Sequence, residues 1–298
     1  MRSTQSMVKI ILPLLFVFLW SGAFIATRAG LPDISPITFL AARFTLAGLI
    51  LAPFTFFSGA LGGWANARRV LPHLIVAGIL INGATLTAGY WALVDISAAT
   101  MALLGSLQPL VTAFLSGAIL GDRFRSTQWF GFCLGTAGVA LVAGINSIDL
   151  GQTEGILWGV GASVCLIAGT LYYARFCRSS ALLTANFVQL TAGAGFCWLV
   201  VLGFEEVYVT VTPTLVWSFL YLTFGVSLGA MGLYLFMLKT GTAGKVTANF
   251  YITPGLTAIL GWLILDESLS PHVLVGFGLA MVGLWLVHSR QPAVIRPR

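Results

Sequence analysis

The chain has 298 residues, of which 58% are hydrophobic and 8% are charged, and its formal net charge is +6. A soluble domain carries about 25% charged residues, so a water-exposed globular protein is excluded. The basic residues are scattered singly between apolar runs, which also excludes the contiguous basic surface typical of nucleic-acid binding.

Apolar runs of about 20 residues follow one another along the whole chain. A helix of this length crosses a hydrocarbon core of about 30 Å, and runs this uniform are not barrel strands. The first run is longer than that of a usual signal peptide, so we expect it to be retained. The sequence predicts an all-α membrane protein whose ten spans lie at about 8–28, 35–57, 70–90, 97–120, 127–144, 153–174, 183–203, 213–238, 243–265 and 270–289.

The basic residues predict the orientation through the positive-inside rule. With a cytoplasmic amino terminus, 13 of the 15 Lys and Arg residues fall inside, and Arg28 and Arg43 are the exceptions. We therefore expect a multi-pass protein of the bacterial inner membrane with both termini in the cytoplasm. The 13 residues are Arg2, Lys9, Arg68, Arg69, Arg123, Arg125, Arg175, Arg178, Lys239, Lys245, Arg290, Arg296 and Arg298.

The stretch 92–142 is written a second time at 237–287, after a shift of 145 positions. Pro109 falls on Pro254, and the pairs Gly131/Gly276, Phe132/Phe277 and Gly138/Gly283 also match. A long fixed period indicates a duplicated structural unit. We expect one five-helix repeat at 1–148 and a second at 149–298, which together form a single membrane domain.

An odd number of helices in each repeat would turn the second copy upside down relative to the first. The polar turn 121–125 would then face inward and its counterpart 266–270 outward, which explains why only the first contains arginines. Inverted repeats are typical of transporters, in which two halves enclose a site near the midplane.

Small residues and prolines mark positions where helices meet or break. Glycines spaced four apart occur at 131/135, 155/159 and 225/229, a spacing that lets membrane helices approach closely, although membrane helices are rich in glycine in any case. Pro109 and Pro254 lie mid-span at equivalent positions, where each removes a backbone N–H donor. We expect cavity-lining kinks or hinges there rather than a purely structural bend.

Polar side chains at midplane depth are the first candidates for substrate contacts. Asn82, Gln108, Asn249 and Tyr251 lie inside apolar spans, and an amide facing lipid is costly. Amides offer both donors and acceptors, which suits a zwitterionic amino acid. Hydrogen bonding between helices is the alternative role for each, and Gln108 is the strongest candidate because it precedes the Pro109 kink.

Deep aromatic side chains form the second group. Trp20, Tyr90, Trp158 and Tyr234 lie away from the span ends, where tryptophans form the usual interface belt. Rings of this kind suit large apolar or cationic aromatic solutes. Core packing is the alternative role for each ring taken singly.

Charged groups inside the spans are few. Arg43 lies within the second span, where it is a candidate contact for a substrate carboxylate, or alternatively reaches the interface or helix carbonyls. No Asp or Glu lies mid-span, so a proton relay through a buried carboxylate has no carrier, and we expect facilitated diffusion or exchange. The four cysteines lack metal-ligand spacing, and we expect neither a metal nor a cofactor.

The chain resembles the EamA type of the drug/metabolite transporter superfamily. The resemblance rests on the ten spans in two inverted halves, Trp20-Ser21-Gly22, Arg43-Phe44, and the repeated proline, glycine and acidic-turn block. It covers nearly the whole chain and implies a transporter. Within the superfamily, the chain is similar to bacterial exporters of aromatic amino acids and methyl viologen. The second half departs from the pattern, since Gln189 stands where Arg43 stands in the first.

These observations predict a monomeric carrier that exports small molecules, aromatic amino acids first, by alternating access through a midplane site. Export of cationic drugs or other metabolites is the alternative, and a channel is disfavoured by the inverted halves. An intramembrane hydrolase is a remote alternative, because the Gly-x-Ser-x-Gly match at 225–229 lies in an uninterrupted apolar span rather than at a strand-to-helix turn.

Overall fold

The computed structural model describes residues 2–57, 64–96, 101, 104–143, 153–265 and 271–289. These residues are largely helical, and the described chain contains no β-strand beyond an isolated bridge between Ile34 and Val209. The expected turn at 266–270 and the basic residues Arg290, Arg296 and Arg298 lie outside the described residues.

Eight helical stretches are long and apolar enough to cross a membrane, and Leu104–Leu120 is a shorter apolar helix. The ninth expected span, 243–265, is divided into three short pieces. The prediction of an all-α membrane protein is confirmed. The elements are α1 (Arg2–Gly30), η1 (Leu31–Asp33), α2 (Pro36–Phe57), α3 (Trp64–Gly78), η2 (Ile79–Ala84), α4 (Thr85–Asp95), α6 (Gln108–Leu120), α7 (Ser126–Ala143), α8 (Thr153–Phe176), α9 (Leu182–Phe204), α10 (Pro213–Leu220), η3 (Tyr221–Ala230), α11 (Met231–Thr240), α12 (Ala243–Ala248), η4 (Asn249–Tyr251), α13 (Ile252–Leu265) and α14 (Pro271–His288).

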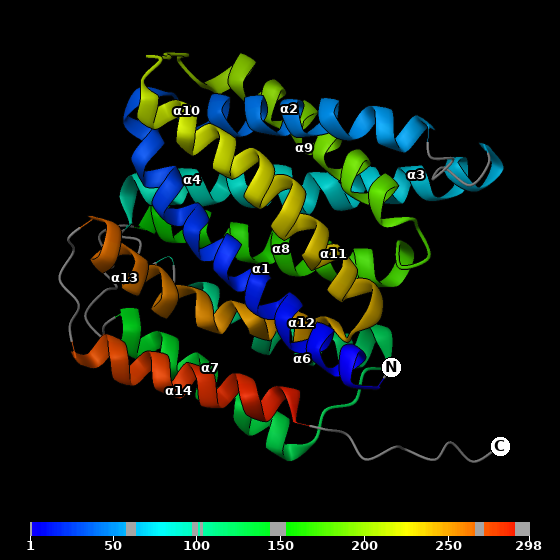
Figure 1. Ribbon diagram of the computed structural model, residues 1–298, viewed down its shortest axis with the longest axis vertical. Helices are drawn as coiled ribbons and strands as arrows, with labels where there is room; N and C mark the ends of the chain where they lie inside the picture. Colours follow the sequence, from blue (N-terminus) through cyan, green and yellow to red (C-terminus); the bar gives the residue numbers. More distant parts are fainter. Residues whose placement is uncertain are drawn as a thin grey trace.

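The helices run side by side across the molecule (Figure 1). The pair α2 and α9 forms one end of the row, and the pair α7 and α14 forms the other. Between them, α8 contacts the α3–η2–α4 span and α6, whereas α1 contacts the α10–η3–α11 span and α13. These two sets of neighbours are equivalent under the repeat, so the packing itself has two-fold pseudosymmetry.

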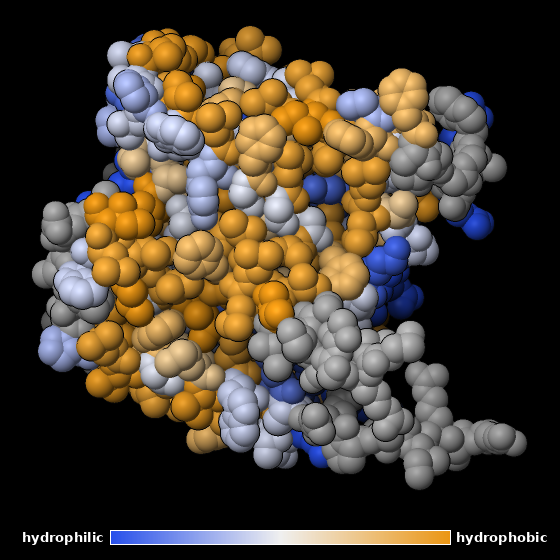
Figure 2. All heavy atoms as spheres, in the orientation of Figure 1, coloured by the Kyte–Doolittle hydropathy of each residue, from blue (hydrophilic) through white to orange (hydrophobic). Residues whose placement is uncertain are grey.

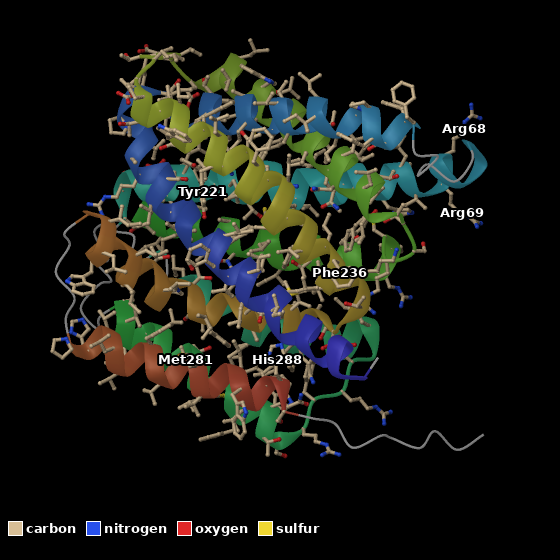
Figure 3. The ribbon with its side chains drawn as sticks, viewed as in Figure 1. Arg68, Arg69, Tyr221, Phe236, Met281 and His288 are labelled. Carbon is tan, nitrogen blue, oxygen red and sulfur yellow. The ribbon has the colours of Figure 1, made fainter. Side chains whose placement is uncertain are left out.

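Two spans change from α-helix to π-helix at equivalent positions. The π-helical segments are η2 and η3, and a shift of 145 residues carries η2 onto 224–229, inside η3. The η3 segment is held against α1 by Tyr221, whose hydroxyl donates to the Leu19 carbonyl at 3.1 Å (Figure 3). π-Helical segments are rare and occur often at functional sites. Their occurrence in both halves indicates that the feature belongs to the repeat.

Glycine contacts between α7 and α14 show that the two copies are inverted. A Cβ atom on Gly138 would lie 2.6 Å from the Gly276 carbonyl oxygen, and one on Gly131 would lie 2.7 Å from the Gly283 carbonyl oxygen. The residue numbers therefore rise along one helix as they fall along the other. Because α14 is the repeat equivalent of α7, antiparallel packing means that the second copy points in the opposite direction.

The other glycine pairs differ in what they meet. Cβ atoms on Gly155 and Gly159 would lie 2.7 Å from Asp95 and Leu104 side-chain carbons, so α8 approaches its neighbours closely there. The nearest atom to a Cβ on Gly225 is 3.5 Å away, an ordinary van der Waals distance. The four-residue spacing alone therefore does not separate close contacts from open ones.

Glu205 joins the two halves at the start of α2. Its carboxylate accepts hydrogen bonds from the backbone N–H groups of Ile37 and Thr38, both at 2.7 Å, and from the Thr38 hydroxyl at 2.8 Å. These N–H groups belong to the first turn of α2 and have no partner within the helix. A carboxylate is favourable at a helix amino terminus, so Glu205 acts as a cap supplied by the other repeat.

We expect Glu205→Ala to lower the free energy of unfolding by about 2 kcal/mol, because several hydrogen bonds to one carboxylate are lost together. Thermal unfolding in detergent measures the change, and the exposed neighbour Glu206 provides the matched control Glu206→Ala. Equal melting temperatures for the two variants would show that the cap contributes nothing.

The surface of the helix row is apolar over most of the face in Figure 2. Side chains such as Phe57, Leu202 and Phe204 are exposed, as lipid-facing residues of a membrane protein are. The α14 helix ends at His288 on the side where Arg68 and Arg69 lie (Figure 3). The α1 helix begins on the same side (Figure 1), which fits an even number of crossings.

Candidate substrate site

Helices begin at both repeated prolines. The α6 helix starts at Gln108, directly before Pro109, and a turn at Leu107 separates it from the preceding helical residues. In the second half, the 3-10 segment η4 separates α12 from α13, and Pro254 lies in the first turn of α13. Proline is tolerated in a first turn because the missing N–H group would have no partner there. The spans are thus interrupted rather than bent in mid-helix, and a hinge role for the two prolines stays a prediction.

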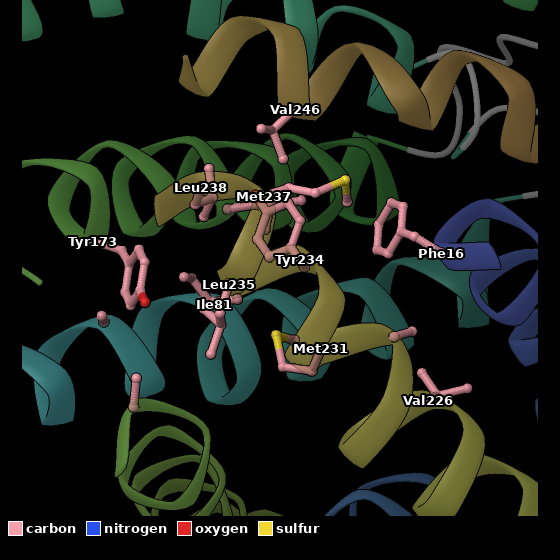
Figure 4. Packing of buried hydrophobic residues seen from close by; sticks show 14 of the residues in the cluster. Phe16, Ile81, Tyr173, Val226, Met231, Tyr234, Leu235, Met237, Leu238 and Val246 are labelled. Atoms are coloured by element: carbon pink, nitrogen blue, oxygen red, sulfur yellow. The ribbon is translucent and has the colours of Figure 1, made fainter. Parts of the chain in front are cut away.

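Aromatic rings from three elements meet beside the second interruption. Phe16 and Trp20 of α1, Tyr234 of α11 and Phe250 of η4 form a cluster in which ring centroids lie 5.3–5.8 Å apart. Figure 4 shows Phe16 and Tyr234 within this packing. We call these four residues the aromatic cluster. It combines one ring-bearing element of the first half with two of the second.

The Tyr234 hydroxyl has a partner on a further helix. It lies 2.6 Å from the Thr170 hydroxyl of α8, and both side chains are buried. The aromatic cluster is therefore tied to α1, α8, α11 and η4, the elements of the first, sixth, eighth and ninth spans. Spans of both halves therefore converge at the aromatic cluster.

Gln108 is held between α6 and α8. Its side-chain amide donates to the Ser163 hydroxyl at 3.0 Å, and Ser163 donates to the Gly159 carbonyl at 3.1 Å. The Gln108 amide thus forms a hydrogen bond between two helices and also lies beside an interrupted span. Its role as a substrate contact stays a prediction.

Asn249 and Tyr251 are hydrogen-bonded to the protein itself. The Asn249 amide donates to the Val246 carbonyl at 2.8 Å, and the Tyr251 hydroxyl donates to the Phe132 carbonyl at 3.0 Å. The Tyr251 hydroxyl also lies 3.1 Å from the Thr136 hydroxyl. These bonds tie η4 to α12 and α7, so both residues anchor the interruption in this structure.

Trp158 and Tyr90 lie apart from the aromatic cluster. Trp158 is 38% exposed and packs edge-to-face on Trp91, with ring centroids 4.7 Å apart. The Tyr90 hydroxyl donates to the Thr27 hydroxyl at 3.5 Å, and Tyr90 interacts electrostatically with Arg43. The structure thus separates the predicted aromatic residues into three places.

Arg43 and Asn82 occupy a second, polar region between α2, η2 and α9. Arg43 is only 5% exposed and its Nε atom has no hydrogen-bond partner. Asn82 is fully buried, and neither its amide nitrogen nor its amide oxygen has a partner. Such groups are costly in a membrane interior, so their retention indicates a use.

Further buried polar groups without partners were not among the predicted site residues. Both polar atoms of Gln189, the Ser227 hydroxyl and the Thr223 hydroxyl belong to this set. Ser227 is the repeat equivalent of Asn82, since 82 plus 145 is 227, and the two residues lie in the two π-helical segments. A polar residue at equivalent depths in both copies is the signal that could have identified Ser227.

The model of the EamA-like transporter family matches residues 7–144 and again residues 153–289. The chain belongs to the EamA-like transporter family. This EamA-like protein is a membrane transporter and not an enzyme. The Gly-x-Ser-x-Gly match lies inside the helical segment η3, so the hydrolase alternative lacks the turn it requires.

Several proteins are similar to this EamA-like transporter over nearly its whole length. A WAT1-related chloroplastic protein of Arabidopsis thaliana is 26% identical over 91% of this chain and 67% of its own length. A probable terminal-alkyne amino-acid exporter of Streptantibioticus cattleyicolor is 26% identical over 93% and 92% of the two chains. The uncharacterized inner membrane transporter YedA of Escherichia coli is 23% identical over 90% and 87%.

A solved crystal structure shares the fold of this EamA-like transporter. The two structures superpose with a TM-score of 0.78 at 20% sequence identity, covering 93% of this chain and 95% of the other. Agreement over almost the whole length shows that the arrangement of helices is that of a known fold.

Proposed function

We propose that this EamA-like transporter exports amino acids, aromatic ones first, across the bacterial inner membrane, working as a monomer with both termini in the cytoplasm. The observation that carries the proposal is the aromatic cluster of Phe16, Trp20, Tyr234 and Phe250, assembled beside an interrupted span. A planar solute can replace ring-to-ring contacts within such a cluster with equivalent contacts to its own ring. The relative described as a probable amino-acid exporter supports this substrate class.

Alternating access is the mechanism that the inverted halves favour. The aromatic cluster lies between α1 of the first half and α11 and η4 of the second, so a relative movement of the halves would open it. The interruptions before Pro109 and Pro254 are matched places at which helix ends can change direction. Because no Asp or Glu lies mid-span, we expect exchange or facilitated diffusion rather than obligatory coupling to a buried carboxylate.

Uptake of labelled L-tryptophan into proteoliposomes that contain the purified protein tests the function. We expect saturable uptake that accelerates when unlabelled L-phenylalanine is preloaded inside, because a carrier returns faster when it is loaded. Trp20→Ala and Phe250→Ala should each raise KM about two- to tenfold, since one aromatic contact contributes about 0.5–1.5 kcal/mol beyond the area it buries.

Trp217→Ala is the matched control, because Trp217 on α10 is 73% exposed and is therefore not part of the protein interior. A fall in melting temperature with unchanged KM would show that the aromatic cluster serves packing alone. Folded protein that moves quaternary ammonium cations but no aromatic amino acid would establish the alternative substrate class. Flux that neither saturates nor responds to preloading would indicate a channel.

A further inference from the structure

Arg43 is a buried cation that has no neighbouring anion in the described part of the chain. Among the described residues, the titratable groups that interact electrostatically with it are Tyr90 and Cys197, and both are uncharged near neutral pH. Its guanidinium carbon lies 4.9 Å from the centre of the Phe44 ring, which stabilises the cation without neutralising it. Burying a charge in this way is costly unless an opposite charge joins it.

Asn82 lies beside the same ring. A Cβ atom on Gly193 would be 2.8 Å from Asn82 Cβ and 3.6 Å from a Phe44 ring carbon, so all three residues meet at one level of α9. The Asn82 amide is fully buried and both of its polar atoms lack partners. A buried cation whose Nε atom lacks a partner and a buried amide without partners thus flank one phenylalanine.

The neighbouring contacts show how this region is built. One helical turn from Gly193, Cys197 faces the Thr87 hydroxyl at 3.8 Å and also interacts with Arg43. Tyr90, one turn further along α4, donates to Thr27 of α1. Thr27 lies seven residues after Trp20, so both occupy one face of α1 about 10 Å apart. This face of α1 therefore connects the polar region with the aromatic cluster.

We infer that Arg43 and Asn82 form a carboxylate-binding subsite of the transporter, distinct from the aromatic cluster. A carboxylate would neutralise Arg43 and accept a hydrogen bond from the Asn82 amide nitrogen, so one ligand supplies a partner to each of the two side chains. The guanidinium fork matches the two oxygens of a carboxylate. This inference rests on the proposed function and narrows it, because substrates must then carry a carboxylate whatever their side chain.

The test compares acid and amide forms of one ligand. L-phenylalanine and L-phenylalaninamide differ in the carboxylate and retain the same ring and amino group. Binding to the purified full-length protein in detergent, followed by tryptophan fluorescence, should be at least tenfold tighter for the acid. Arg43→Met should reduce this ratio to about one, and Arg43→Lys should keep part of it, because lysine retains the charge and loses the fork.

Asn82→Leu provides a second variant in case Arg43→Met does not fold. It should weaken binding of the acid and leave binding of the amide form nearly unchanged. Equal binding of acid and amide by the wild type, or an unchanged ratio in the folded Arg43 and Asn82 variants, would overturn the inference. A purely structural role for Arg43 would lower the melting temperature without altering the ratio.

The same preparations separate this inference from the proposed function. Tryptophan transport combined with equal binding of acid and amide would retain the function and exclude the subsite. An Arg43-dependent preference for L-leucine over L-leucinamide, without transport of any aromatic amino acid, would retain the subsite and exclude the aromatic substrate. Absence of binding by any of the four ligands to folded protein would overturn both.

Discussion

Replacing Gly276 with alanine is expected to lower the free energy of unfolding by about 3 kcal/mol, because a single added methyl group would force apart the helices that join the two halves. A Cβ atom there would lie 2.6 Å from the Gly138 carbonyl oxygen and 2.8 Å from the Val142 backbone nitrogen. Both are backbone atoms, so no side-chain rotation relieves the contact. Thermal unfolding in detergent and the yield of monodisperse protein measure the effect.

Gly278 supplies a stringent control for this variant. It lies two residues away on α14, and a Cβ atom there would meet nothing within 4 Å. Gly278→Ala should be neutral or slightly stabilising, because alanine favours a helix over glycine by about 1 kcal/mol in an exposed interior position. Similar melting temperatures for Gly276→Ala and Gly278→Ala would show that the α7–α14 contact is not as close as described.

Replacing Gln189 with methionine is expected to raise the free energy of unfolding by about 2 kcal/mol. Gln189 is fully buried on α9, and neither polar atom of its amide has a hydrogen-bond partner. An unpaired buried polar group costs about 1–3 kcal/mol, and methionine fills a similar volume without that cost. The backbone of Gln189 lies against Gly78, because a Cβ atom added to Gly78 would come within 2.5 Å of Gln189 Cα. The side chain that replaces Gln189 must therefore keep a similar shape.

Gln108→Met should change stability in the opposite direction. Gln108 is also buried, but its amide donates to Ser163 at 3.0 Å. Loss of that bond should cost about 1 kcal/mol, and Ser163 keeps its bond to the Gly159 carbonyl. Melting temperatures of both variants in one detergent provide the comparison. A decrease for Gln189→Met would indicate that its amide has a partner in the folded protein.

Much of the fold could be predicted from one-dimensional properties of the sequence. Run length and hydropathy indicate membrane helices, because a span must be long enough and must satisfy its own backbone groups. The repeat from 92–142 to 237–287 indicates duplication, and an odd number of spans per copy implies inversion. The antiparallel contacts of Gly131 with Gly283 and of Gly138 with Gly276 agree with that inversion.

The candidate site could be predicted only as a set of residue types at suitable depth. Trp20 and Tyr234 were chosen as deep aromatic residues and do belong to one cluster, whereas Trp158 was chosen by the same criterion and packs at the surface on Trp91. Phe16 and Phe250 were not chosen, because phenylalanine is common in apolar spans and hydropathy does not distinguish a ring in a cluster from one facing lipid.

The sequence alone thus determined the class of protein, its duplication and the depth of its polar and aromatic residues, because length, hydropathy and charge are read along the chain. Only the tertiary structure decided which groups meet. Whether Gln108 is paired and Asn82 is not depends on atoms of α8 and α9, far away in sequence. A helix presents every side chain at some angle, and only packing against its neighbours decides which of them face lipid, a partner or a substrate.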